Sequence, residues 1–169
     1  MEAEDLEDLY LAASTPEIWK GHPSKDRYQR EVFAPYAESL LRRGTTLVVI
    51  ETRTDQIIGC SSYYVSPDQP NSIAIGFTFL QATYWGGATN FELKRLMLDH
   101  AFQSFDEVWF HIAPSNLRSQ RATAKLGAEY VGDAVLDLSG VATEWMCYRL
   151  REETWNKTCI ERATHIGKS

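Results

Sequence analysis

The segment Tyr84–Lys94 has the residue types of a phosphate-binding turn. Two glycines and an alanine let a ligand approach the backbone closely, because they carry little or no side chain. A threonine followed three residues later by a glutamate is a capping-box pattern, which predicts a helix beginning near Asn90. The first turn of a helix attracts phosphate through its backbone N–H groups and the positive end of its dipole. The segment matches neither the P-loop nor the dinucleotide-binding motif, so a capped turn without a ligand is the alternative. The residues concerned are Gly86, Gly87 and Ala88 in the turn and Thr89, Asn90 and Glu92 in the helix start.

Basic side chains gather in the region that follows this segment, although the whole chain is acidic. Residues 94–125 hold five basic and three acidic residues, whereas the chain has a formal net charge of −6. Arg118, Arg121 and Lys125 recur at i, i+3 and i+7 and therefore share one face of a predicted helix. That face suits an anionic ligand, and the alternative is an ordinary solvated polar face.

The elements that must position these residues begin with two helices and three strands. Apolar residues recur at helical spacing in the second helix, and Gly44 ends it. Stretches rich in β-branched and aromatic residues predict the strands, and the first two form a hairpin. A loop marked by Pro67, Pro70 and Asn71 leads into the third strand. The helices are predicted at 4–13 and 26–43, and the strands at Thr45–Glu51, Ile57–Val65 and Ile73–Leu80.

Beyond the third strand the chain alternates between helix and strand. Parallel neighbours need a long connection, so this alternation predicts a mixed sheet with crossover helices, an α/β (α+β) fold. A closing hairpin follows, and we expect the polar tail 156–169 to be peripheral. The helices are predicted at 90–105 and 117–126, and the strands at Val108–Ala113, Glu129–Leu138 and Val141–Leu150.

Length and composition are those of one ordinary globular domain. The chain has 169 residues, of which 44% are hydrophobic, so we predict a packed core and a single domain over 1–169. The acidic balance argues against general nucleic-acid binding, and no apolar run is long enough to span a membrane. Cys60, Cys147 and Cys159 form no metal-ligand pattern with the four histidines and favour a reducing compartment. We therefore predict a cytoplasmic protein without a bound metal.

Two segments together resemble the GNAT acetyltransferases. The first is the glycine turn after the third strand, and the second is the run Asn116–Ala128. Within that superfamily the chain looks like the branch that contains the ribosomal-protein N-terminal acetyltransferases, over about Ile18 to Trp155. The resemblance implies a mixed, mostly antiparallel central sheet with flanking helices. The family's first strand is missing or very short here, because an acidic helical stretch follows Met1 at once.

The resemblance also implies acetyl-CoA as co-substrate. In the family a Q/R-x-x-G-x-G/A turn wraps the pyrophosphate, and Thr83 stands where Gln or Arg is usual. Backbone N–H groups near the end of the third strand hold the thioester carbonyl, an asparagine contacts the pantetheine arm, and basic residues meet the 3′-phosphate. The residues implied to bind the cofactor are Leu80, Gly86, Gly87, Ala88, Thr89, Asn90, Asn116, Arg121 and Lys125.

Acyl transfer to an amine needs a neutral amine and a proton for the departing thiolate. A family tyrosine often gives that proton, but this sequence has Thr123 at its position. We predict that Ser119, one helical turn after Asn116, gives it instead; a helix cap is the alternative role. His111 is the predicted base because imidazole titrates near neutral pH, and strand alternation places it on one face with Trp109. A water chain as base, with His111 in packing, is the alternative.

The predicted function is direct acetyl transfer from acetyl-CoA to a primary amine of a small molecule, peptide or protein. The family's acceptor site has one wall where Trp19, His22, Arg27 and Tyr28 fall. One alternative is a catalytically degenerate acyl-CoA-binding module that acts as a sensor or partner protein, and another is binding of a different phosphorylated ligand such as a nucleotide. We expect neither nucleic acid nor a membrane as a partner. Five tryptophans and eight tyrosines leave ring surface for a homodimer.

Overall fold

The computed structural model of this protein describes residues 1–166, with side chains through residue 164. Within this range the chain divides into two compact units. The first comprises Met1–Tyr64 and Ile75–Leu96, and the second comprises Val65–Ala74 and the described residues from Met97 onward. A single domain over 1–169 stays a prediction.

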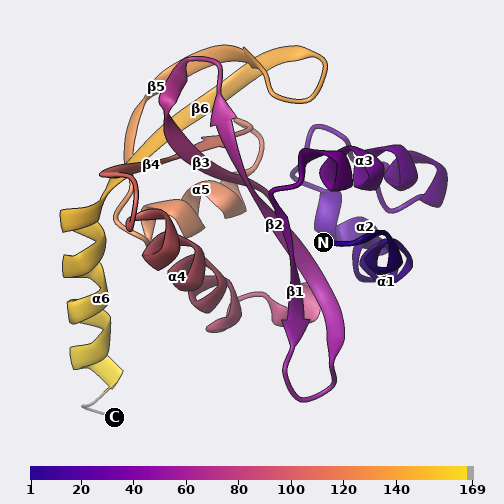
Figure 1. Ribbon diagram of the computed structural model, residues 1–169, viewed down its shortest axis with the longest axis horizontal. Coiled ribbons are helices and arrows are strands. Elements are labelled where there is room, and N and C mark those ends of the chain that lie inside the picture. The colour runs from indigo at the N-terminus through magenta and orange to yellow at the C-terminus, as the bar shows by residue number, and fades with distance from the viewer. Residues whose placement is uncertain (167–169) are drawn as a thin grey trace. The chain divides into compact units, whose positions relative to one another are not determined.

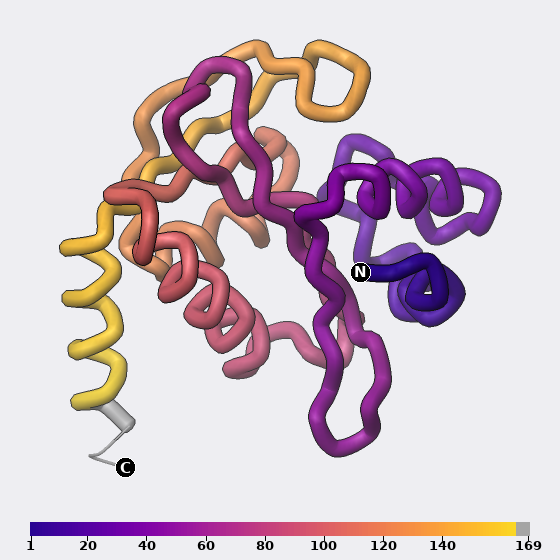
Figure 2. The backbone as a smooth tube through the Cα atoms, in the orientation of Figure 1, coloured from indigo at the N-terminus to yellow at the C-terminus, as the bar shows by residue number. Residues whose placement is uncertain are grey.

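The first unit opens with helices. These are η1 (Ala3–Asp5), α1 (Leu6–Ala13), α2 (Pro16–Trp19) and α3 (Arg30–Arg43). Helix α1 packs against α3, as the trace in Figure 2 shows. Helix α3 ends where Gly44 takes a left-handed backbone with φ +68°, as expected for a helix stop. It begins at Arg30 rather than at residue 26, because the chain around Asp26 turns and the Gln29 N–H donates to the Asp26 carbonyl.

Aromatic rings form the centre of this unit. The ring centroids of Trp19, Phe33 and Phe79 lie 5.3–6.3 Å from one another. Trp19 is buried, and its indole N–H donates to the Ala13 carbonyl at 2.8 Å. Tilted ring pairs of this kind add stability beyond the area that they bury. The cluster therefore fixes Phe79, which directly precedes the predicted cofactor residue Leu80.

Six strands form one sheet in the order β1-β2-β3-β4-β6-β5 (Figure 1). Strand pairs β1/β2, β4/β6 and β5/β6 are antiparallel, whereas β3/β4 is parallel at Ile73–Val108 and Ala74–Trp109. This mixed, mostly antiparallel sheet confirms the predicted fold class. No strand precedes α1 in the described part of the chain. The strands are β1 (Thr46–Glu51), β2 (Gln56–Ser66), β3 (Gln69–Leu80), β4 (Glu107–Ile112), β5 (Glu129–Asp137) and β6 (Ala142–Arg151).

The loop predicted before the third strand is shorter than expected. Strand β3 begins at Gln69 instead of Ile73, so Pro70 and Asn71 lie in the strand and only Pro67 and Asp68 form the turn. A strand tolerates proline where the missing N–H faces no partner strand. The turn therefore holds Asp68 directly before the start of β3.

The second unit contains α5 (Leu117–Ala124), the end of α4 (Thr89–Ala101) and α6 (Glu152–Ile166). The polar tail is thus mostly helical, which its composition did not predict. Trp155 anchors α6: its side chain is 1% exposed, and its indole N–H donates to Asp99 Oδ1 at 2.9 Å. Gly127 lies against the same helix, since a Cβ there would be 2.8 Å from Thr158 Oγ1. None of the helices in residues 1–166 combines the length and apolarity that crossing a membrane requires.

Candidate active site

The predicted phosphate-binding turn has an open backbone. It follows the short helix η2 (Ala82–Tyr84), and Gly86 has a φ of +74°, a conformation that favours glycine. A Cβ at Gly86 or at Gly87 would meet no heavy atom within 4 Å. The turn therefore leaves room beside its backbone for a ligand.

Side-chain and backbone bonds hold this turn against the end of β3. The Trp85 indole N–H donates to the Leu80 carbonyl at 2.9 Å, which fixes the orientation of that peptide. The next N–H along the chain, that of Gln81, donates to the Ile58 carbonyl at 2.8 Å. The Gln81 N–H is therefore already used within the sheet and cannot be one of the groups that hold a thioester carbonyl.

Helix α4 starts one residue earlier than predicted. The Glu92 N–H donates to the Ala88 carbonyl at 2.9 Å, so Ala88 caps the helix and Thr89 is its first residue. The capping-box assignment of Thr89 is therefore wrong by one position, within the usual uncertainty of helix ends. Thr89 and Asn90 still lie in the first turn, where N–H groups have no partner inside the helix.

Backbone strain lies close to this site and was not predicted. Phe77, in the middle of β3, has a φ of +51°, which is unusual for any residue except glycine. Opposite, a Cβ on Gly59 would be 2.1 Å from the Phe79 carbonyl oxygen, so only glycine fits there. Strained backbone concentrates at functional sites. A glycine inside an apolar strand was the one sequence signal of such a close approach.

Lys94 does not belong to the basic surface that the sequence indicated. Its side chain is buried between α4 and the sheet, where Nζ donates to Thr78 Oγ1 at 2.8 Å and to Ser61 Oγ at 3.3 Å. Burial lowers its pKa to about 7, and the nearby Cys60 opposes this only in part. The long aliphatic stem lets the ammonium group reach polar partners inside, which a count of charges along the chain cannot show.

The asparagine and serine of the second motif are neighbours at the start of α5. Asn116 is the N-cap residue, and its Oδ1 accepts from the Ser119 N–H at 3.2 Å. The Asn116 N–H donates to the Ala113 carbonyl at 2.8 Å. Ser119 is half-buried, whereas Thr123, at the family's tyrosine position, is 5% exposed. A hydroxyl at position 123 is thus held inside.

The basic residues of α5 are exposed. Arg118 and Arg121 lie in the helix, and Lys125 is its C-cap residue with a helical backbone. The spacing that places them on one face is therefore kept to the end of the helix.

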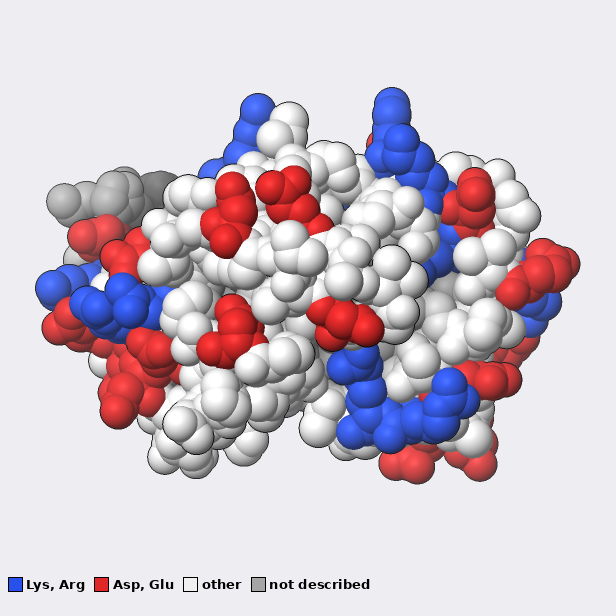
Figure 3. Space-filling view, turned by 90° about the horizontal axis from the view of Figure 1, so that it is seen from above, with Lys and Arg blue, Asp and Glu red and all other residues white. Residues whose placement is uncertain are grey.

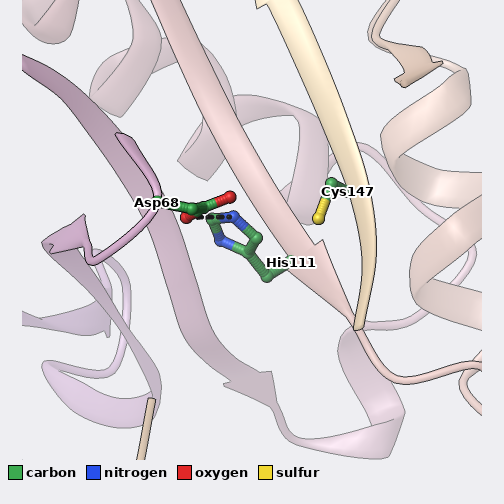
Figure 4. A group of neighbouring side chains, drawn as sticks. All are labelled: Asp68, His111 and Cys147. Atoms are coloured by element: carbon green, nitrogen blue, oxygen red, sulfur yellow. Dashed lines mark ion pairs between the residues drawn. The ribbon is translucent and has the colours of Figure 1, made fainter. Parts of the chain in front are cut away.

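His111 is a buried residue of β4. Its ring stacks on Trp109 with an interplanar angle of 11° and a centroid distance of 6.5 Å, which agrees with the predicted alternation. Its side chain exposes 0% of its surface, and Nε2 lies 3.8 Å from Asp68 Oδ1 (Figure 4). Burial lowers the pKa of His111, and the Asp68 carboxylate opposes that shift. The imidazole is therefore neutral at neutral pH, as a proton acceptor must be.

Among the residues predicted to line the acceptor site, Arg27 and His22 belong to a cation–aromatic cluster in the first unit. The Arg27 guanidinium lies 3.7 Å from the centroid of the Tyr36 ring, and Nη1 is 3.1 Å from His22 Nε2. Burial, with Arg27 beside it, lowers the pKa of His22 to about 3. Trp19 belongs to the core, and the Tyr28 carbonyl accepts from the Tyr10 hydroxyl at 3.4 Å.

The predicted site residues fall into two sets by unit. Leu80 and the turn from Gly86 to Asn90 belong to the first unit. The second unit holds His111, Asn116, Ser119, Arg121 and Lys125. Within the second set, Asn116 and Ser119 are in direct contact.

Solved structures share this fold. A GCN5-related N-acetyltransferase from Brucella melitensis superposes with a TM-score of 0.76 at 15% identity, over 93% of this chain and 76% of that chain. RimJ of Mycobacterium smegmatis, solved in complex with CoA-disulfide, gives 0.69 at 17% identity, over 99% and 87% of the two chains. The aminoglycoside acetyltransferase AAC(6′)-Ib, in complex with coenzyme A and kanamycin, gives 0.66 at 18% identity, over 94% and 95%. At these identities the likeness concerns the fold.

The family is identified from a match to a family model rather than from an individual relative. No curated protein sequence matches this chain. The family model described as an acetyltransferase (GNAT) domain matches residues 1–129, which is most of the chain and includes the glycine turn and α5. The protein therefore belongs to the GNAT acetyltransferase family.

Proposed function

We propose that this protein transfers the acetyl group of acetyl-CoA directly to a primary amine of a small molecule, peptide or protein. The observation that carries the proposal is the GNAT family match over 1–129, within which Gly86 takes a left-handed backbone beside open space. RimJ and AAC(6′)-Ib were each solved with a form of coenzyme A, which supports the same cofactor here.

The cofactor residues divide by the part of acetyl-CoA that each would bind. Backbone N–H groups of the turn from Gly86 to Ala88, with Thr89 and Asn90, suit the pyrophosphate, because they lie at a glycine turn and the start of a helix. Asn116 would meet the pantetheine arm through its side-chain amide. Arg121 and Lys125 would meet the 3′-phosphate, since both are exposed cations.

Acetyl-CoA supplies an activated thioester, and the residues of this chain handle charge and protons. Backbone N–H groups near Leu80 would stabilise the negative charge that develops on the carbonyl oxygen as the amine nitrogen bonds to the carbonyl carbon. His111, or a water chain, would accept a proton from that nitrogen. Ser119 would donate its hydroxyl proton to the thiolate as the carbon–sulfur bond breaks, and solvent would then reprotonate Ser119.

A catalytically degenerate acyl-CoA-binding module is the second candidate function. The observation in its favour is Thr123, which replaces the family's tyrosine and is only 5% exposed. Without that tyrosine the chain lacks the family's usual proton donor. In this case the chain would bind acyl-CoA as a sensor or partner protein and make no product.

Two measurements distinguish the candidates. The first is thermal unfolding with and without acetyl-CoA, with ATP as the control nucleotide. The second is an assay for acetylated product over a panel of amines. A ligand at about 100 times its dissociation constant adds about 2.7 kcal/mol to the free energy of unfolding. A higher midpoint with acetyl-CoA and an acetylated amine support the enzyme. A higher midpoint without any product supports the binding module, and stabilisation by ATP alone contradicts both.

The compartment and assembly belong to the same proposal. In the described part of the chain Cys60, Cys147 and Cys159 form no disulfide, which supports a reducing, cytoplasmic location. A homodimer is proposed only on the ring content of the sequence, and sedimentation of the purified chain tests it.

A further inference from the structure

Three side chains of different chemistry converge in the second unit. Asp68 comes from the turn between β2 and β3, His111 from β4 and Cys147 from β6. One ligand atom from each lies within 4.8 Å of the other two. Figure 4 shows the imidazole between the carboxylate and the thiol.

The sheet itself sets two of these positions. His111 and Cys147 are directly paired residues of the antiparallel strands β4 and β6, so their Cα atoms are held opposite each other. Asp68 stands in a turn, where the Ser66 hydroxyl donates to its Oδ1. Two ligands on rigid strands and a third on a turn that can adjust form a preorganised set.

The geometry favours a shared ion over a catalytic relay. In a cysteine–histidine–aspartate relay, the acid and the thiol contact different nitrogens of the ring. Here a single ring nitrogen lies within 4.8 Å of both the thiol and the carboxylate. Such convergence on one nitrogen is what a common metal ion requires.

We propose that Asp68, His111 and Cys147 form a Zn²⁺ site. Zinc accepts this combination of sulfur, nitrogen and oxygen, with bonds of about 2.0–2.3 Å and tetrahedral geometry. Ligand atoms around such an ion lie roughly 3.5 Å apart. The 3.8 Å between Nε2 and Asp68 Oδ1 is close to that value, and the thiol and the turn need to move inward by about 1.3 Å at most.

Burial and charge support the same assignment. The side chain of His111 exposes 0% and that of Asp68 28%, so the set is closed on one side and open at the turn. Asp133 on β5 places a second carboxylate near the thiol, which makes the surroundings favourable for a cation. Water would supply the fourth ligand at the open side, as in zinc sites with three protein ligands.

Binding would convert the Cys147 thiol to a zinc-bound thiolate and release one proton to solvent, while His111 binds as neutral imidazole. Zinc on the ring would occupy the lone pair that the proposed base uses. The site itself does not depend on the proposed function, because metal binding is measured in the absence of acetyl-CoA.

The test is a zinc titration of the reduced, full-length protein against a chromophoric chelator. We expect one Zn²⁺ per chain, and a loss of affinity of more than about 100-fold in Cys147→Ser and in His111→Gln, since changes to groups outside the ligand set already cost 10–100-fold. Cys159→Ser is the matched control, because it removes a thiol of α6 that is outside the cluster, and its affinity should not change.

Cobalt(II) gives a second readout that reports the ligand directly. The wild type and Cys159→Ser should show a sulfur-to-cobalt charge-transfer band, and Cys147→Ser should not. Far-ultraviolet circular dichroism without metal checks that each variant is folded. If Cys147→Ser or His111→Gln does not fold, Asp68→Asn, at the exposed turn, replaces it in the zinc titration. A wild type that takes up no zinc, or a charge-transfer band that persists in folded Cys147→Ser, overturns the site.

Discussion

Gly86 combines a left-handed backbone with open space beside it, where the proposed cofactor would lie. Valine at this position would destabilise the left-handed backbone by roughly 1–2 kcal/mol and would place its side chain in the open space beside the turn. We therefore expect Gly86→Val to weaken acetyl-CoA binding at least about tenfold, or about 1.4 kcal/mol. Isothermal titration measures the affinity.

The matched control for this change is Gly140→Val. Gly140, between β5 and β6, also has positive φ, +94°, and a Cβ there would likewise meet nothing within 4 Å. The two substitutions thus introduce similar backbone strain, but only Gly86→Val changes the predicted cofactor turn. Equal acetyl-CoA affinities in the two variants would contradict the assignment of the turn.

Substitution of Ser119 distinguishes a role in proton transfer from a role in capping α5. The bond to Asn116 Oδ1 uses the Ser119 backbone N–H, so Ser119→Ala keeps the helix cap. A lost general acid costs about 10²- to 10⁴-fold in rate, so kcat should fall while acetyl-CoA affinity stays the same. Steady-state kinetics measure kcat, and Ser139→Ala, an exposed serine in the β5–β6 turn, is the control. Wild-type turnover in Ser119→Ala would remove the role.

At the scale of elements, α4 meets β2 and β3 through a buried lysine. Lys94 has a pKa lowered to about 7 by burial, against an ordinary value near 10.5. Between these two values the unfolded chain holds a proton that the folded chain has released, so stability rises with pH and is lost as pH falls toward 7. The slope is about 1.4 kcal/mol per pH unit.

Lys94→Met should lack this slope. Ser61 and Thr78 bond to each other at 2.7 Å, so their hydroxyls keep a partner in the variant. We expect the variant to be at least as stable as the wild type at pH 6, and the wild type to gain on it by about 1.4 kcal/mol per unit from pH 7 to 9. Urea unfolding measures both, with Arg95→Met, an exposed neighbour, as control. A constant difference across this range would show that Lys94 does not titrate in the fold.

Helix α6 depends on a single large anchor. Trp155 is 1% exposed and bonded to Asp99. Its replacement by alanine leaves a cavity, and such changes cost about 3–5 kcal/mol. We expect Trp155→Ala to lower the free energy of unfolding by that amount, and Ile160→Ala, on an exposed face of the same helix, to change it little. Similar denaturation midpoints for the two variants would mean that α6 does not depend on Trp155.

Elements were predictable from the sequence where local pattern alone decides them. Helical spacing identified α3, and Gly44 marked its end, because both signals lie within one stretch of chain. The first residues of β3 were missed because prolines usually mark loops, and α6 was missed because Trp155 is the only large apolar side chain on its less exposed face, as far as its side chains are described, beside Thr154 and Thr158. Contacts between distant segments, such as Asp68 with His111 and Cys147, leave no spacing signal at all.

At the scale of the whole molecule, net charge and local charge act in opposite directions on an anionic cofactor. The chain carries a formal charge of −6, and on the face in Figure 3 acidic and basic side chains lie among one another. Long-range repulsion therefore opposes the approach of a phosphate-bearing ligand. Binding must draw on contacts shorter than the Debye length, about 10 Å at 0.1 M salt.

Whether acetyl-CoA affinity falls or rises with salt tells whether local attraction or long-range repulsion dominates. The proposed contacts of Arg121 and Lys125 with the 3′-phosphate would weaken as salt screens them, so acetyl-CoA affinity of the wild type should fall between about 0.05 and 0.5 M salt. The double variant Arg121→Gln/Lys125→Gln should bind more weakly and lose most of that dependence. Lys20→Gln/Arg42→Gln removes the same charge from two other exposed positions and should retain it. An affinity that rises with salt in the wild type would mean that repulsion by the whole molecule outweighs these two cations, and that the 3′-phosphate is bound elsewhere.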